Sequence, residues 1–150
     1  MFNFPLEAVL KIRHRKLEQA QLALAESLRA VERIRGELSA LTRERERGKE
    51  EMRNRSLEGL PADEFILRRR HLNGLRVKSG QLREELVGCH RVVAQRRQEL
   101  VAADKEKKMV ERLKEQAYVR YGQEVKAREM KALDEFAVIR FARARRNRHA

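Results

Sequence analysis

Apolar residues recur every seven positions through most of this chain. In the N-terminal part, one line of the repeat holds Leu10, Leu17, Leu24, Val31 and Leu38, and a companion line holds Leu6, Ala20, Ile34 and Leu41. Further along, the two lines are Phe65, Leu72, Leu86, Val93 and Leu100, and Leu75, Leu82, Cys89, Ala103, Val110 and Ala117. A repeat sustained over this distance gives a helix a narrow apolar seam, which predicts a coiled coil.

The repeat is interrupted between residues 53 and 63, where turn-forming residues gather. Asn54, Ser56, Gly59 and Pro61 predict an irregular bend that joins two antiparallel helices. We therefore expect an all-α fold, a single long two-helix coiled-coil hairpin over residues 1–150. The first helix is expected at about 5–53, the bend at 54–62, the longer second helix at about 63–140 and a basic tail at 140–150. The Asn73-Gly74 pair is a second candidate for a helix end.

Composition supports a thin, elongated fold, because 39% of the residues are charged and only 5% are aromatic. Disorder is the alternative for such a composition. The one cysteine and the four dispersed histidines suggest no metal site, and a two-helix rod offers no pocket for catalysis. We expect no enzymatic activity, no cofactor and no small-molecule substrate. The chain also has no apolar run of about 18 residues and no signal-like start, so a cytoplasmic location is expected.

The formal net charge is +13, and the C-terminal tail contributes much of it. No acidic residue follows Glu135, whereas five arginines do: Arg140, Arg143, Arg145, Arg146 and Arg148. Such a tail attracts nucleic acid, anionic lipid or an acidic protein. A basic helical nucleic-acid-binding protein is therefore one alternative function. Against it, the basic residues before the tail are interleaved with glutamates.

Both ends of the chain resemble the bacterial flagellar FliJ family. The N-terminal resemblance rests on the run from Phe4 to Arg13, followed by Glu18, Ala20, Leu24 and Ala25. The C-terminal resemblance rests on the run from Lys107 to Glu115, then on Tyr121, Glu129 and the run from Lys131 to Ala137. The arginine tail departs from the family pattern.

The resemblance implies a non-enzymatic component of the flagellar type III protein export apparatus, shaped like the central stalk of a rotary ATPase. The implied partners are the hexameric export ATPase, the cytoplasmic domain of the export gate and export chaperones. Contact with the membrane would then be indirect, at the cytoplasmic face of the flagellar base. The near alternative is the equivalent stalk of a virulence-type secretion system, which the hairpin pattern does not separate from a flagellar one.

Two groups of residues are candidate contacts. For the ATPase ring, the candidates come from the matched segments, at the end where both termini are expected to meet: Arg13, Arg15, Lys131, Asp134 and Glu135. For the gate or a chaperone, they are apolar residues near the bend or beyond the pairing limit: Leu38, Leu41, Leu72, Leu75, Tyr118, Tyr121 and Phe136. The competing interpretation is that the leucines complete the coil.

Overall fold

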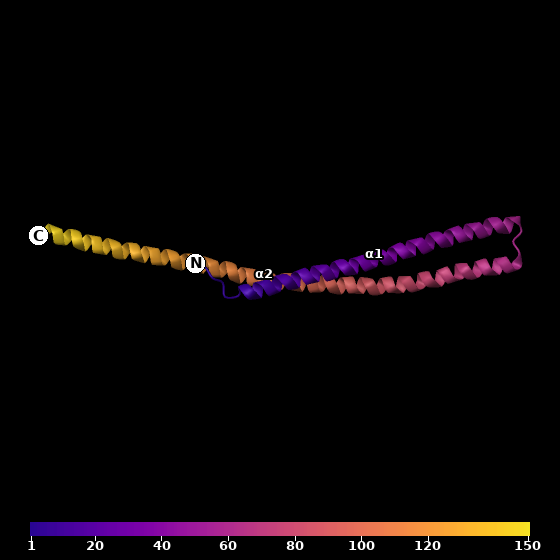
Figure 1. Ribbon diagram of the computed structural model, residues 1–150, viewed down its shortest axis with the longest axis horizontal. Coiled ribbons are helices and arrows are strands. Elements are labelled where there is room, and N and C mark those ends of the chain that lie inside the picture. The colour runs from indigo at the N-terminus through magenta and orange to yellow at the C-terminus, as the bar shows by residue number, and fades with distance from the viewer. The chain divides into compact units, whose positions relative to one another are not determined.

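The computed structural model describes residues 1–150 and contains two α-helices joined by a short connection (Figure 1). Helix α1 spans Glu7–Glu58, and helix α2 spans Ala62–Arg148. The first has 52 residues and the second 87, and they pack against each other as an antiparallel hairpin. The all-α hairpin with a longer second helix is therefore confirmed.

Local sequence explains where the helices begin and end. Before α1, the backbone amide of Glu7 donates to the carbonyl of Phe4 at 3.2 Å, and Pro5 needs no donor there. Gly59 ends α1 because its φ of +94° is one that side-chain-bearing residues rarely adopt. In α2, Asp63 and Glu64 place negative charge in the first turn, where the helix dipole favours it.

Both helices extend further than the sequence indicated. Helix α1 continues past residue 53 to Glu58, because Asn54 and Ser56 are tolerated in a helix. The Ser56 hydroxyl donates to the Met52 carbonyl at 2.7 Å, so it is satisfied within the helix. Helix α2 is unbroken at Asn73-Gly74 and continues through the arginine tail, whose positive charges suit a helix C-terminus.

The chain divides into two compact units. We call residues 17–103 the bend unit, and residues 1–16 with 104–150 the terminal unit. The bend unit has a thin core in which residues from both heptad lines meet. Its buried members are Ile34, Leu41, Leu75 and Leu82, with Leu38, Leu72, Leu86 and Cys89 packed against them. No large side chain is completely buried, as expected of a two-helix seam.

Small residues let the seam of the bend unit continue at positions that lack a large apolar side chain. Ser27 is buried, and its hydroxyl donates to the Leu24 carbonyl at 2.7 Å, so it costs no unpaired polar group. Gly48 lies against Leu72 so closely that an added Cβ would be 2.8 Å from the Leu72 Cδ2 atom. The stretch from Arg43 to Gly48 is therefore charged on its outer side and part of the seam on its inner side.

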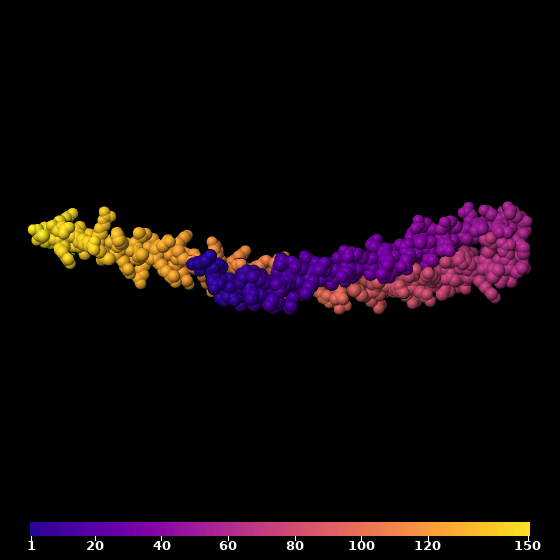
Figure 2. All heavy atoms as spheres, in the orientation of Figure 1, coloured from indigo at the N-terminus to yellow at the C-terminus, as the bar shows by residue number.

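The paired part of the terminal unit is held differently, with charged residues beside the seam. Arg13 of α1 forms an ion pair with Glu106 of α2 at 2.6 Å, and Glu7 pairs with Lys114 at 2.9 Å. Val110 is the buried apolar residue of α2 here. From residue 126 to the C-terminus every residue is exposed, and Figure 2 shows this part of α2 as a helix with no other segment against it.

Candidate interaction surfaces

The four leucines near the bend belong mainly to the hairpin core. Leu41 and Leu75 are buried, with 9% and 7% of their surface exposed. Leu38 and Leu72 are partly buried against them. A partner therefore reaches Leu41 and Leu75 only if the helices separate. These positions face the partner helix because they lie on the heptad lines, which is the interpretation that the sequence left open for them.

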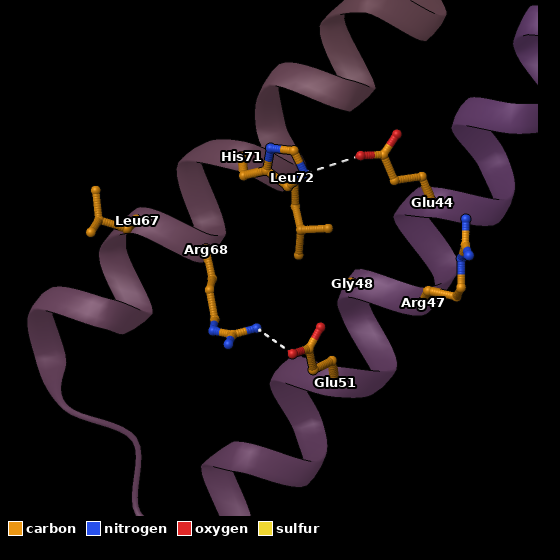
Figure 3. A pocket seen from close by; sticks show the side chains of 8 residues that line it. All are labelled: Glu44, Arg47, Gly48, Glu51, Leu67, Arg68, His71 and Leu72. Carbon is orange, nitrogen blue, oxygen red and sulfur yellow. Dashed lines mark ion pairs between the residues drawn. The ribbon is translucent and has the colours of Figure 1, made fainter.

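A solvent-open groove of about 520 Å³ lies across the two helices of the bend unit, close to Leu72 (Figure 3). Two ion pairs bridge it. Arg68 pairs with Glu51 at 3.3 Å, and the His71 Nε2 atom lies 3.4 Å from a Glu44 carboxylate oxygen. The charged side chains point toward each other from the two helices, so these ion pairs link α1 to α2 across the groove. Such exposed pairs contribute at most about 1 kcal/mol each.

The two tyrosines of α2 lie beside the N-terminal segment of the chain. Tyr118 is 62% exposed and Tyr121 is half-buried. Both contact Phe2, which precedes α1. A cavity of about 550 Å³ opens beside Phe2, Leu10 and Tyr118. This surface combines apolar rings with the charged side chains of neighbouring turns.

Beyond these tyrosines, α2 presents large apolar side chains to solvent without a partner. The exposed set comprises Met130, Leu133, Phe136, Val138, Ile139 and Phe141, each at least 52% exposed. Because consecutive residues of an α-helix are about 100° apart, the run from Phe136 to Phe141 covers all sides of the helix. The arginines from Arg140 to Arg148 are likewise distributed around it.

The candidate ATPase contacts fall into two separate groups of the terminal unit. Arg13 is paired with Glu106, whereas Arg15 is exposed on α1. Lys131, Asp134 and Glu135 are exposed on the unpaired part of α2. Lys131 lies roughly 37 Å further along α2 than Glu106, at 1.5 Å per residue. The expectation that the two termini meet is therefore wrong, because α2 continues well past the start of α1.

Sequence reasoning missed two contributors to these surfaces. Phe2 contacts Tyr118 and Tyr121 of α2, and Phe4 is only 7% exposed. Their signal was present as two aromatic residues directly before Pro5, in a chain with few aromatics. The second is Gly48, whose heptad position, seven residues after Leu41, is the sequence signal for the close approach of Leu72.

No group of three or more His, Cys, Asp or Glu side chains is arranged to hold a metal ion. None of the helices has an apolar stretch long enough to cross a bilayer. What the hairpin offers instead is one partly paired helix with aromatic and basic side chains at its free end. These features define a two-helix coiled-coil hairpin protein.

Comparison with known proteins identifies the family to which this chain belongs. The family model described as "Flagellar FliJ protein" matches residues 2–146, so the chain belongs to the FliJ family of the flagellar and type III export apparatus. Among solved structures, a putative YscO homolog from Chlamydia trachomatis shares the fold, with a TM-score of 0.67 and 20% sequence identity. That match covers 93% of this chain and 94% of the other. No curated protein matches the sequence.

Proposed function

We propose that this chain is the central stalk of the flagellar export ATPase and works at the cytoplasmic face of the membrane without catalysing a reaction itself. The observation that carries the proposal is the unpaired part of α2, residues 126–148, in which every residue is exposed. Apolar and cationic side chains lie on all sides of this helix. A partner that touched it from one side would leave half of them in water, whereas a ring that surrounds it would cover them.

The charges of this segment support a partner with acidic walls. Five arginines follow Glu135 and no acid does. Long-range attraction of this kind raises association rates and is weakened by salt. Within the segment, Lys131, Asp134 and Glu135 are the proposed contacts from the family resemblance. Arg15 is a second, separate contact, while the Arg13 side chain is engaged by Glu106.

The test is the ATP hydrolysis rate of the purified export ATPase with and without this chain. We expect the chain to raise the rate while hydrolysing nothing alone. Replacing Ile139 and Phe141 with Ala should lower the stimulation without loss of helicity, because both side chains are at least 52% exposed and unpaired. Leu22→Ala is the matched control, since Leu22 is 65% exposed but lies on α1 in the bend unit. Absence of stimulation, or equal losses in both variants, would contradict the stalk role.

Recognition of the export gate or a chaperone is proposed for Tyr118, Tyr121 and Phe136. Exposed aromatic side chains on a charged surface often supply most of the binding energy of an interface. Ala substitution of the two tyrosines should weaken capture of the gate domain and leave ATPase stimulation intact. Leu38, Leu41, Leu72 and Leu75 remain proposed contacts only for an opened hairpin, because they take part in its core.

The equivalent stalk of a virulence-type secretion system is the second candidate. It is favoured by the shared fold with the putative YscO homolog, although 20% identity supports the fold alone. A deletion strain separates the two functions, because loss of a flagellar stalk abolishes swimming while loss of a virulence stalk abolishes effector secretion. Nucleic-acid binding, the alternative from charge, predicts an affinity for duplex DNA that falls steeply with salt.

A further inference from the structure

The bend unit changes in character where Gly48 of α1 lies against Leu72 of α2. Going from this contact away from the bend, the seam contains buried apolar residues, of which Leu41 and Leu75 are the first. Between the contact and the bend lie residues 49–58 and 59–71, which together we call the tip, and none of them is buried. The tip therefore lacks the apolar core that holds the remainder of the bend unit together.

Arginine takes the place of apolar residues on the heptad lines at the tip. Arg55 of α1 and Arg68 of α2 each occupy a position of these lines. The apolar residues that remain on the lines are Met52, which is half-buried, and Phe65, which is 37% exposed. A solvent-open cavity of about 740 Å³ lies beside both of them. Because apolar contact stabilises in proportion to the area that it removes from water, these positions add little stability through burial.

The two arginines belong to a network of ion pairs that crosses between the helices twice. Arg55 of α1 contacts Glu64 of α2 at 3.0 Å, and Glu64 contacts Arg68 at 3.4 Å. Arg68 in turn contacts Glu51 of α1 at 3.3 Å (Figure 3). The Arg68 side chain is 25% exposed, whereas that of Glu51 is 61% exposed. Ion pairs in contact with water thus join the two helices at the tip.

Such a network is weaker than an apolar seam and responds to a different variable. An exposed ion pair shifts an equilibrium by at most about 5-fold, whereas burial of one leucine shifts it by roughly 10- to 150-fold. Exposed charges are screened beyond about 10 Å at 0.1 M salt and beyond about 3 Å at 1 M. Regions with few buried apolar contacts open locally at a lower free energy than global unfolding requires.

We propose that the tip is a salt-sensitive opening unit, which separates and unwinds while the seam from Leu41 and Leu75 onward stays paired. Only three residues connect Glu58 to Ala62, so the two helices cannot move far apart there while they remain fully wound. Opening therefore unwinds the turns next to this connection. The proposal goes beyond the stalk function, whose proposed ATPase contacts lie in the terminal unit.

Native-state amide hydrogen exchange of the full chain tests the proposal. In about 50 mM NaCl, the protection factors of residues 49–58 and 62–71 should be lower than those of residues 27–41 and 75–89, which contain the buried seam. Raising NaCl to about 1 M should lower the protection of the tip by about 5-fold, because the ion pairs are screened. The protection of the seam should stay within about 2-fold, because apolar burial does not depend on charge.

A double variant removes the two arginines of the network. Replacing Arg55 and Arg68 with Gln should lower the protection of the tip by about 5-fold at low salt and abolish its response to salt. The matched control replaces Arg35 and Arg96 with Gln. Each of these arginines forms an ion pair within its own helix, with Glu32 on α1 and with Glu99 on α2, so the tip should keep its salt response.

Equal protection of the tip and the seam at low salt would refute a separate opening unit. If salt lowers the protection of both by the same factor, the hairpin opens as a whole and the proposal is wrong. A tip that does not respond to salt, or a response that persists without Arg55 and Arg68, would show that the network does not hold the tip closed. None of these measurements involves the export ATPase, so the proposals for the tip and for the stalk function fail independently.

Discussion

Leu82→Ala tests whether the seam of the bend unit stabilises the hairpin. Leu82 is 7% exposed and packs in one cluster with Ile34, Leu41 and Leu75. Leu→Ala in a core costs about 2–5 kcal/mol, the upper values arising where a cavity stays open. No large side chain of this hairpin is completely buried, so neighbours can close over the gap. We therefore expect the lower part of that range, about 2–3 kcal/mol.

The assay is thermal and urea unfolding followed by circular dichroism at 222 nm. For a chain of this size, a loss of 2–3 kcal/mol corresponds to a fall in Tm of about 5–10 °C. Leu67→Ala is the control, because Leu67 lies on the same helix and is 64% exposed. The change in helix propensity is then the same in both variants. Since exposed substitutions usually fall within about 0.5 kcal/mol, equal melting of the two variants would refute the assigned register.

Three further predictions concern glycines and one ion pair. Gly88→Ala should stabilise α2 by about 0.5–1 kcal/mol, because no atom lies near the added methyl group. Gly48→Ala should stabilise the protein less, since its added Cβ would meet the Leu72 side chain. The urea unfolding midpoints of the two variants give the comparison. Gly59→Ala should destabilise by about 1–2 kcal/mol in the same assay, because the φ of +94° is strained for alanine, and an unchanged midpoint would contradict this reason. Glu106→Gln should lower the free energy of unfolding by less than about 1 kcal/mol, because its ion pair with Arg13 is partly exposed. It should also speed amide hydrogen exchange around residues 104–117. A larger loss of stability would mean that this ion pair holds the terminal unit together.

The hairpin was predictable because apolar residues recur at a regular seven-residue interval in the sequence. A seven-residue repeat specifies which face of each helix is buried, and Gly59 with Pro61 marks the connection. Helix ends were less predictable, because Asn54, Ser56 and the Asn73-Gly74 pair are weak breakers. Tertiary pairing along the seam outweighs their unfavourable propensity. The continuation of the seam through Gly48 depends on a close approach that charge patterning concealed.

The candidate contacts could be assigned to positions on the helices but not to neighbours. Tyr118 and Phe136 lie on α2 beyond Lys114, which pairs with the first residue of α1, and both are exposed. The two residues differ in their neighbours, because Phe2, which precedes α1, contacts the Tyr118 ring. No periodic pattern describes a non-helical segment of a few residues. Its path follows from apolar contact and from where the first helix starts, which only the three-dimensional arrangement supplies.

The unpaired end of α2 has a consequence for how tightly any partner binds. Residues 126–148 receive no tertiary support, so their helical order depends on intrinsic propensity and on charge at the helix terminus. Forming a helix at the moment of binding subtracts its ordering entropy from the affinity. Substitutions such as Ala137→Gly, at a residue that needs to touch nothing, would therefore weaken capture by about as much as they weaken the helix, roughly 1 kcal/mol. The helix propensity of residues 126–148 therefore changes the affinity for a partner even where the side chains that contact the partner stay the same.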